Sequence, residues 1–560
     1  MAIKKKKKKR FGSGAFSGSS KSREQSPLRP HQIEKMPPCR HVCPSGNRIR
    51  DFVTTIAQAE RLGKTPDQAF GEAWEIYTDT SPFPAVCGRV CPHPCEDNCN
   101  RNELDGAVNI NSIERAIGDF GLEKQLKLKT LSDEKRPEKI AVVGAGPGGL
   151  SCAYQLARRG YGVTVFEAAE KPGGMLLWGI PRYRLPADVL EGEIGKILDL
   201  GVELKCNVRV GTDVALDDLR AEYQAVFVSI GAHQGLKLRV EGEEAENVFS
   251  GVEFLNRIAH GEKIDVGDNV IVVGGGDTAI DAARICRRLG ATTTILYRRT
   301  IEEMPAIDDE IEEAQEEGVK LEYLAAPVGF NKEGNRITSM KCIRMKLGDP
   351  DESGRRRPVP VEGSEFEIPA TAVIPAISQA PGFTGFQTLV EGKDWIKVDA
   401  DGASTKVEGV WAGGDAVSLA LVTTAVGQGR RAAESIDLKL RGEERPKDTD
   451  SPLIKTDHMR LDHYEKKDRS HIPKLPPDER LKGMDTEVNL AVPQQQAIAE
   501  AQRCMSCGYC FDCEKCWLFC QDQAVAKPMQ KGVLYTFKLE NCTGCKKCAE
   551  ECPCGFIDML

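Results

Sequence analysis

The chain has no long hydrophobic run. Its 560 residues contain no stretch of about eighteen apolar residues, the length that a helix needs to cross a bilayer. The basic run Lys4–Arg10 resembles the start of a secretory signal, but no apolar segment follows it. These two absences predict a cytoplasmic protein with no membrane span.

Basic residues are outnumbered by acidic residues beyond the amino terminus. The formal net charge is −8 at pH 7, which argues against general affinity for nucleic acid. Residues 1–30 are the exception, because they are rich in Lys and then in Gly and Ser. We expect them to form a flexible, solvated tail or, alternatively, an arm that docks an acidic partner.

Cysteine is scarce in the long middle of the chain. Only four of the 21 cysteines lie there, and we expect them to be small apolar core residues: Cys152, Cys206, Cys286 and Cys342. Six others lie between Cys39 and Cys99, and eleven lie between Cys504 and Cys554. Because a reducing cytoplasm disfavours disulfides, the two dense groups predict metal ligands.

The sequence divides into blocks around an α/β middle. Residues 137–445 repeat a strand, a glycine-rich turn and a helix, which is typical of a parallel-sheet α/β domain. Residues 31–136 predict helices around cysteine-bearing loops, with candidate helices at Ile49–Ala59 and Pro66–Tyr77. Residues 446–500 predict a charged, Pro-containing connector to a ferredoxin-like α+β domain at residues 501–560.

A dinucleotide fingerprint opens the α/β block. Gly144, Gly146 and Gly149 are spaced G-x-G-x-x-G between an apolar strand and a helix. The first glycine allows a tight turn, the second lets a pyrophosphate approach the backbone, and the third permits close helix–strand packing. Glu167 ends the next strand, where a carboxylate accepts hydrogen bonds from a ribose diol.

A second fingerprint follows at Gly274 and Gly276, with Ala279 in place of the third glycine. The next strand ends in Arg298 and Arg299 rather than in an acid. An arginine at that position suits a 2′-phosphate through charge-assisted hydrogen bonds, which favours NADPH over NADH. The alternative is that both arginines form surface ion pairs.

A late Gly414-Asp415 pair precedes a helix that begins near Thr424. In flavoproteins with two dinucleotide sites such a pair returns to the first nucleotide domain, so we expect FAD there. Asp415 would hold the ribityl or phosphate region, and the helix N-terminus near Thr424 would stabilise negative charge on reduced flavin. This order predicts an FAD domain (residues 137–250 and 375–445) split by an inserted NAD(P)H domain (residues 251–374).

Further motifs resemble the glutamate synthase small-subunit family: Gly173–Leu176, Gly179–Pro186, Gly274–Ala279, Tyr297–Arg299 with Met304-Pro305, and Cys87–Cys99. The resemblance covers about residues 37–440 and implies a helical iron–sulfur domain, FAD and an NADPH-type site. With the fingerprints, it gives these FAD-binding residues: Gly144, Gly146, Pro147, Gly149, Glu167, Gly174, Met175, Arg182, Gly414, Asp415 and Thr424. The NAD(P)H-binding residues are Gly274, Gly276, Asp277, Thr278, Ala279, Arg298 and Arg299.

Six cysteines precede the α/β block: Cys39, Cys43, Cys87, Cys91, Cys95 and Cys99. They are enough for one four-ligand cluster, and for two only with substitute ligands. Family members usually carry a further C-x-x-C upstream, where this chain has Met36 and the tail, while Glu114 matches a position where an oxygen ligand can replace cysteine. The resemblance implies one [4Fe–4S] cluster and leaves a second open. Zinc is the alternative, since thiolates bind both metals.

The last sixty residues contain two C-x2-C-x2-C-x3-C runs. This is the bacterial two-cluster ferredoxin pattern, in which the fourth cysteine of each run ligates the other cluster. We therefore predict one [4Fe–4S] centre on Cys510, Cys513, Cys516 and Cys552, and another on Cys542, Cys545, Cys548 and Cys520. Cys504, Cys507 and Cys554 are left over and are not expected to be ligands, although a shifted register would use the first two.

These sites predict an oxidoreductase that passes electrons between NAD(P)H, FAD, iron–sulfur clusters and a partner protein. A hydride would pass between nicotinamide and flavin, and the flavin would convert two-electron into one-electron traffic. No Ser-His-Asp, metal-hydrolase or glycosidase constellation is evident.

Two segments bear on the partner. Arg503–Cys510 and Cys516–Cys520 resemble the branch of the family that serves dissimilatory sulfite reductase in sulfur-oxidising bacteria (DsrL-type). We expect that enzyme as the partner, and a homodimer is also compatible with the sequence. The alternatives are a ferredoxin:NADP oxidoreductase component of a 2-oxoacid oxidoreductase and a glutamate synthase small subunit. An electron-wiring subunit that is inactive without its partner is the alternative of another class.

Overall fold

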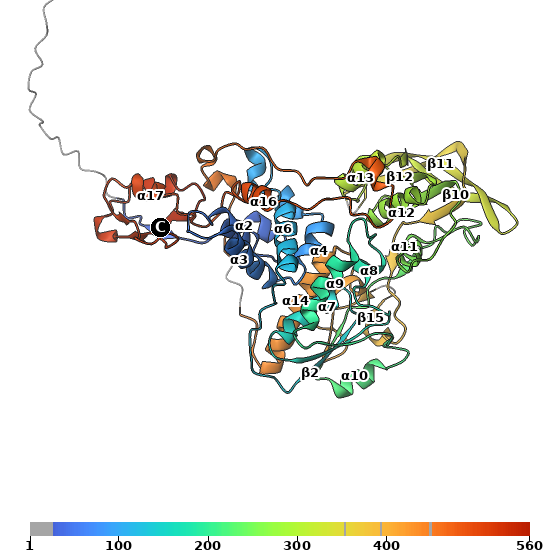
Figure 1. Cartoon of the computed structure of the whole chain (residues 1–560), viewed down its shortest axis with the longest axis horizontal. Helices are drawn as coiled ribbons and strands as arrows, with labels where there is room; N and C mark the ends of the chain where they lie inside the picture. The colour runs from blue at the N-terminus through green and yellow to red at the C-terminus, as the bar shows by residue number, and fades with distance from the viewer. Residues whose placement is uncertain (1–25, 352–353, 393–394, 447–450) are drawn as a thin grey trace, which may run out of the picture.

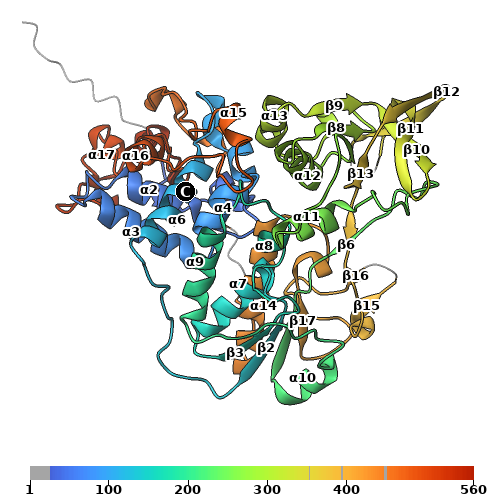
Figure 2. The ribbon, with the colours of Figure 1, turned by 45° about the vertical axis from the view of Figure 1, so that its right-hand side comes forward.

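The computed structural model describes residues 26–351, 354–392, 395–446 and 451–560. The tail predicted for residues 1–30 therefore lies almost wholly outside the described residues. Figure 1 shows a central group of helices, a parallel sheet below it, a second nucleotide-binding domain at one end and the cysteine-rich carboxy-terminal unit at the other. Figure 2, turned by 45°, keeps α17 and β11 at opposite sides of the molecule.

The first parallel sheet combines strands from two distant parts of the chain. Its order is β17-β5-β2-β3-β4, and every pair is parallel. The strands are β2 (Lys139–Val143), β3 (Gly162–Phe166), β4 (Glu203–Lys205), β5 (Ala225–Val228) and β17 (Val410–Ala412). Its helices are α7 (Pro147–Ala157), α8 (Met175–Trp178), α9 (Ala187–Leu198), α10 (Leu216–Glu222) and α14 (Val422–Arg441). The apolar run of β2 is buried, as expected for a sheet covered on both faces.

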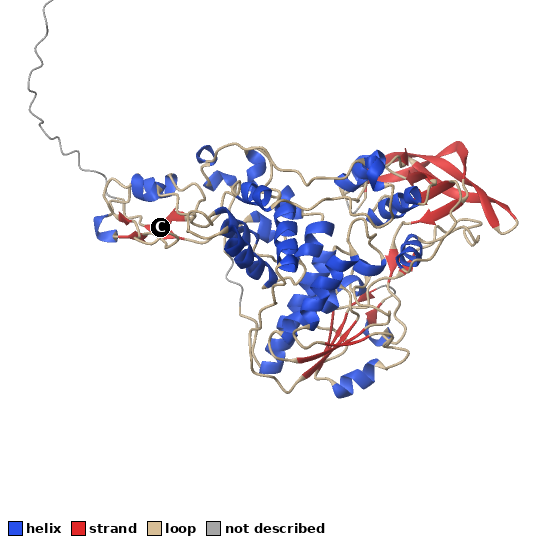
Figure 3. Ribbon diagram, viewed as in Figure 1, coloured by secondary structure: helices blue, strands red, loops and turns tan. Residues whose placement is uncertain are grey.

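The second parallel sheet lies between β5 and β17 in the chain. Its order is β13-β7-β8-β9. The strands are β7 (Asn269–Val273), β8 (Thr292–Tyr297), β9 (Lys320–Tyr323) and β13 (Ala372–Pro375), with helices α11 (Gly251–Ala259), α12 (Asp277–Arg288) and α13 (Asp308–Glu316). An antiparallel sheet of β10 (Ala325–Glu333), β11 (Arg336–Pro350) and β12 (Arg356–Pro369) extends it. Figure 3 shows these long strands at the end of the molecule. Both nucleotide-binding domains thus have the predicted α/β class.

The amino-terminal domain is helical. It contains α1 (Pro38–His41), α2 (Ile49–Ala57), α3 (Pro66–Thr78), α4 (Pro84–Val90), α5 (Pro94–Asp97) and α6 (Ile110–Glu123). The two candidate helices are confirmed, and each ends within two residues of its predicted end. Thr65 and Gln68 start α3 with a reciprocal capping box, which satisfies backbone N–H groups that the first helical turn leaves free.

The carboxy-terminal unit is built from short elements. It holds α17 (Lys515–Leu518), α18 (Lys547–Glu550), and the paired strands β18 (Val525–Ala526) and β19 (Thr536–Phe537). Its last strand, β20 (Ile557–Met559), pairs antiparallel with β1 (Pro30–Gln32). The start of the described chain therefore packs against its end.

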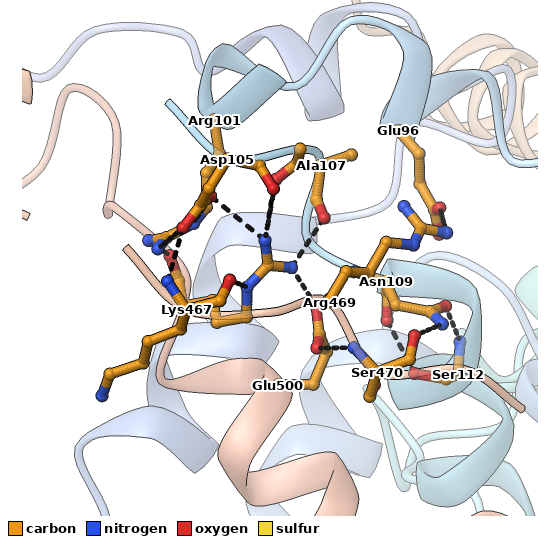
Figure 4. Close-up of polar contacts among 12 residues, drawn as sticks. Glu96, Arg101, Asp105, Ala107, Asn109, Ser112, Lys467, Arg469, Ser470 and Glu500 are labelled. Atoms are coloured by element: carbon orange, nitrogen blue, oxygen red, sulfur yellow. Dashed lines mark hydrogen bonds and ion pairs between the residues drawn. The ribbon is translucent and has the colours of Figure 1, made fainter. Parts of the chain in front are cut away.

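The connector predicted for residues 446–500 joins the second half of the first α/β domain to the carboxy-terminal unit. It is bound to the domains that it crosses. Arg89 binds Glu487 at 2.8 Å, and Lys474 binds Glu313 at 2.8 Å. Close to the amino-terminal cysteines, the Asn109 amide donates to the carbonyl of Ser470 at 2.9 Å (Figure 4). The connector thus fixes the carboxy-terminal unit relative to the rest of the molecule.

The four middle cysteines differ in burial. Cys152, Cys286 and Cys342 are fully buried, as predicted. The prediction for Cys206 is wrong, because this residue follows the short edge strand β4 and is partly exposed. In the part of the chain that the structure describes, no helix has the length and apolar character needed to span a membrane.

Candidate cofactor sites

The first cavity lies where the glycine turn after β2 meets the segment after β17. It has a volume of about 660 Å³, within the range of cofactor pockets. Eight of the eleven predicted FAD residues line it: Gly144, Gly146, Pro147, Glu167, Gly174, Met175, Gly414 and Asp415.

The backbone conformation around this cavity requires a glycine at one position and is stabilised by hydrogen bonds to one acidic side chain. Gly144 has φ +99°, and a Cβ there would stand 2.3 Å from the carbonyl oxygen of Ser229. Glu167 directly follows β3 and accepts hydrogen bonds from the backbone N–H groups of Ala145 (2.7 Å) and Ala169 (2.8 Å). These contacts fix the glycine turn and the acid side chain relative to each other at the wall of the cavity.

Three predicted FAD residues do not line the cavity. Gly149 lies beneath the turn, where a Cβ would stand 1.9 Å from the carbonyl oxygen of Gly144. Thr424 is in the first turn of α14, and its neighbours Leu421 and Val422 reach the cavity instead. Arg182 is half-buried elsewhere, and burial lowers the pKa of its guanidinium.

The second cavity lies above β7 and β8 and has the same volume, about 660 Å³. Five of the seven predicted NAD(P)H residues line it: Gly274, Gly276, Thr278, Arg298 and Arg299. Asp277 instead accepts a hydrogen bond from the backbone N–H of Ile307 at 3.1 Å, and Ala279 is buried under the turn.

The two predicted arginines have different surroundings. Arg298 is exposed at the cavity. Arg299 is buried, donates to the carbonyl of Arg356 at 2.7 Å, and pairs with Asp351 at 2.7 Å. The ion-pair alternative therefore describes Arg299, and Arg298 is the better placed of the two to bind a ligand.

No sequence motif predicted Arg355, which also lines the second cavity. It lies in the turn that joins β11 to β12, far along the chain from the fingerprint. Arg209 and His233 of the first cavity were likewise missed. No motif marks these residues, because tertiary folding alone brings them to the cavities.

The two cavities adjoin. Val252, Asp415 and Ala420 line both of them. Asp415 is partly buried at this junction, and its loss of contact with water raises the pKa of its carboxyl group. Nearby, the Trp178 ring stacks on His260 with centroids 4.1 Å apart and thereby joins α8 to the end of α11. Ligands in the two cavities can therefore meet at Asp415.

The carboxy-terminal cysteines form two groups. Cys510, Cys513, Cys516 and Cys552 line one cavity of about 20 Å³, as the crossed pattern predicts, and Cys554 lies beside them. Cys520 belongs to the other group: burial raises the pKa of Cys548 to about 12, and charges on Cys542, Cys520 and Cys545 add to the shift. The last cysteine of each run thus lies with the other run.

The amino-terminal cysteines also separate. Cys39 and Cys99 line a cavity with Cys504 and Cys507, which were not expected to be ligands. Burial raises the pKa of Cys43, Cys91 and Cys95, and in each case the charge of Glu114 adds to the effect. Glu114 is buried among them, and burial raises its pKa to about 8.

Cys87 belongs with the group around Glu114. It is buried in α4 beside Tyr77, and burial raises its pKa, with added effects from the charges of Cys91 and Glu114. It does not line the cavity of Cys39 and Cys99.

Two family models match the chain. The model for pyridine nucleotide-disulphide oxidoreductases matches residues 138–429. The model described as dihydropyrimidine dehydrogenase domain II, 4Fe-4S cluster, matches residues 25–126.

Three curated relatives are similar over most of the chain. The NADPH-Fe(3+) oxidoreductase subunit beta of Geobacter sulfurreducens is 36% identical over 513 residues, or 84% of this chain and 75% of the relative. The NADP(+)-dependent formate dehydrogenase subunit beta of Moorella thermoacetica is 38% identical over 514 residues, 84% and 70%. The glutamate synthase [NADPH] small chain of Escherichia coli is 36% identical over 427 residues, 71% and 88%.

Proposed function

Because this chain belongs to the pyridine nucleotide-disulphide oxidoreductase family, we propose that it passes electrons between NADP(H) and a partner redox enzyme. It is an FAD- and [4Fe–4S]-containing oxidoreductase. The observation that carries the proposal is the junction of the two large cavities at Asp415.

The two cavities assign roles to the chain's own residues. The turn at Gly144 and the N-terminus of α7 bind a pyrophosphate, and Glu167 orients a ribose. Arg298 binds the 2′-phosphate of NADPH in the second cavity. Asp415 would hold the ribityl or phosphate region of FAD, and the N-terminus of α14 would stabilise negative charge on the reduced flavin. Bound FAD would supply the conversion between hydride and single-electron transfer.

The carboxy-terminal cysteines hold two [4Fe–4S] clusters with crossed ligation in this proposal. One set is Cys510, Cys513, Cys516 and Cys552, and the other is Cys542, Cys545, Cys548 and Cys520. Such clusters supply one-electron steps. Supporting this role, the unit lies at the end of the molecule farthest from the second nucleotide-binding domain (Figure 1).

The partner binds beside these clusters. Trp517, Leu518 and Phe519 are 40%, 61% and 43% exposed, and they lie between the cluster ligands Cys516 and Cys520. Exposed apolar residues in such a group are typical of a protein-binding surface. Two of the relatives are named as beta subunits, which also supports action within a larger enzyme.

Within this function we propose dissimilatory sulfite reductase as the partner. The support is the sequence of Arg503–Cys510 and Cys516–Cys520. Affinity capture of the full chain from its native extract, with the co-purifying redox enzyme identified, tests the partner. Recovery of a glutamate synthase large subunit alone, or of a 2-oxoacid oxidoreductase alone, would contradict it.

Dye reduction tests whether the chain acts alone. Purified holoprotein with NADPH should reduce a viologen dye, and NADH should be the poorer donor. If NADPH bleaches the flavin but the dye stays oxidised until partner is added, the chain is an electron-wiring subunit. If neither nucleotide bleaches the flavin, the proposed function is wrong.

A further inference from the structure

The cavity of Cys39 and Cys99 lies between the helical domain and the carboxy-terminal unit. Its volume, about 30 Å³, exceeds that of a single-water site. Two of its four cysteines come from α1 and from the residue before the 3-10 turn Asn100–Glu103, and two come from the segment after α16 (Gln494–Ala501). Apolar side chains make up much of the remaining wall: Pro37, Pro38, Ile49, Val53, Val108, Ile110 and Met505.

The four thiols line one cavity, and the side chains of Arg50 and Arg101 line it with them. Iron–sulfur clusters are held by cysteine thiolates, four for each [4Fe–4S] centre. The cavity therefore offers one complete set of cluster ligands.

Buried arginines hold the Cys504 segment against the loop that follows Cys99. The Arg503 guanidinium, 1% exposed, donates to the carbonyls of Ala107 at 2.7 Å and Gly106 at 2.9 Å. Arg101 donates to the carbonyl of Arg503. Figure 4 shows Arg101, Asp105 and Ala107 grouped around these contacts. Cys504 is thus positioned by direct contacts to the helical domain, and not only by its own local fold.

A third arginine holds Cys507. Arg50 of α2 is 4% exposed and donates to the carbonyls of Cys507 at 3.2 Å and Lys35 at 3.0 Å. Its guanidinium also lies over the Tyr509 ring, 5.0 Å from the centroid. Both cysteines of the C-x-x-C pair are therefore fixed from the helical side.

We propose that Cys504 and Cys507 join Cys39 and Cys99 to bind a [4Fe–4S] cluster. Both carboxy-terminal runs have full ligand sets without this pair. Among the described residues, no three His, Cys, Asp or Glu side chains are grouped so that they could hold a single ion. Thiols spread around a cavity instead suit a cluster, in which each thiolate binds a different iron.

The proposed cluster joins two parts of the electron path. Cys507 and Cys510 are three residues apart, so their Cα atoms lie within about 11 Å of each other. The cluster is therefore adjacent to the first carboxy-terminal centre. It also leaves Cys43, Cys87, Cys91, Cys95 and Glu114 as a separate group in the helical domain.

Iron counting in single and double variants tests the proposal. Cys504→Ser, Cys507→Ser and Cys39→Ser should each lose about four iron atoms per chain, with the same EPR signal missing from the reduced protein. Cys39→Ser/Cys504→Ser should lose no more than either single variant, because both residues serve one cluster. Cys206→Ser, in the FAD domain, is the matched control and should keep all its iron.

Three results would overturn the proposal: unchanged iron in Cys504→Ser, a loss of about eight iron atoms in the double variant, or loss of zinc in place of iron. The second is what a shifted ferredoxin register requires. Flavin content and bleaching by NADPH are measured on the same samples. Failure there contradicts the proposed function but leaves the iron count as an independent result.

Alkylation of the wild-type holoprotein avoids any folding defect of the variants. Iodoacetamide should leave Cys39, Cys99, Cys504 and Cys507 unlabelled, and all four should react together once a chelator removes the clusters. Labelling of Cys504 or Cys507 in the intact holoprotein, with Cys510 still protected, would contradict the proposal.

Discussion

The two nucleotide-binding domains share the same strand–turn–helix unit but differ at two positions, the third fingerprint residue and the residue after the next strand. In the first, Gly149 occupies the third fingerprint position and Glu167 is the residue directly after the next strand. In the second, these places belong to Ala279 and Arg298. Each cavity has a volume of about 660 Å³. The two side-chain positions are therefore a clear chemical difference between the sites.

The third position differs because the helices approach their turns differently. A methyl group already fits at Ala279, which is fully buried. At Gly149 the same methyl group would stand 1.9 Å from the carbonyl oxygen of Gly144, inside any real contact distance. The helix of the first domain is thus packed more closely on its turn.

The largest expected effect comes from Gly149→Ala. The new Cβ has to displace backbone, and overpacking of this kind costs about 3 kcal/mol, or roughly a hundredfold in FAD affinity. Titration of apoprotein with FAD, followed by flavin fluorescence, measures it. Gly162→Ala is the control, since a Cβ there meets nothing within 4 Å. Normal FAD content in Gly149→Ala would show that the turn is less rigid than its geometry indicates.

Glu167→Gln should have the next largest effect. The carboxylate accepts from two backbone N–H groups, and an amide oxygen can replace only one of its two acceptor oxygens. Loss of a hydrogen bond by a buried group costs about 2 kcal/mol, which predicts roughly 30-fold weaker FAD binding. Glu170→Gln, exposed three residues later, should bind FAD normally. An equal effect in both variants would point to surface charge and away from ribose recognition.

Arg298→Ala should raise the KM for NADPH roughly tenfold, about 1.5 kcal/mol, and leave the KM for NADH nearly unchanged. Arg299→Ala should instead lower Tm, because Asp351 and the carbonyl of Arg356 lose their donor. Steady-state kinetics with both nucleotides and a thermal melt separate the two outcomes. A tenfold change in KM for NADH as well would contradict recognition of the 2′-phosphate.

The predictable parts of the structure are those in which residues that contact one another are also close together in the sequence. Each fingerprint runs through adjacent residues of a strand, a turn and a helix, so spacing alone indicated Gly144 and Gly274. The crossed pairing of Cys552 with Cys510 also follows from a repeated local motif. In both cases nearly all of the information lies within one short segment.

The unpredicted parts depend on contacts between distant segments. Cys504 meets Cys39 because Arg503 and the connector bind the loop after Cys99, and no local spacing encodes that approach. Arg299 forms an ion pair with Asp351, which lies on a hairpin about fifty residues later in the chain. Cys206 was predicted to be a core residue, but it follows a strand at the edge of the sheet and is partly exposed.

The smallest effect is expected from Ala279→Gly, the reverse of the first substitution. The second turn already accommodates a methyl group, so its removal relieves no clash and leaves only a small void. Glycine inside α12 costs about 1 kcal/mol of stability through backbone entropy.

NADPH affinity should change less than about threefold, since the atoms of Gly274 and Gly276 that line the cavity stay in place. A thermal melt with an NADPH titration checks both parts. If Ala279→Gly weakened NADPH binding as strongly as Gly149→Ala weakens FAD binding, the third position would matter through flexibility of the turn rather than through close packing.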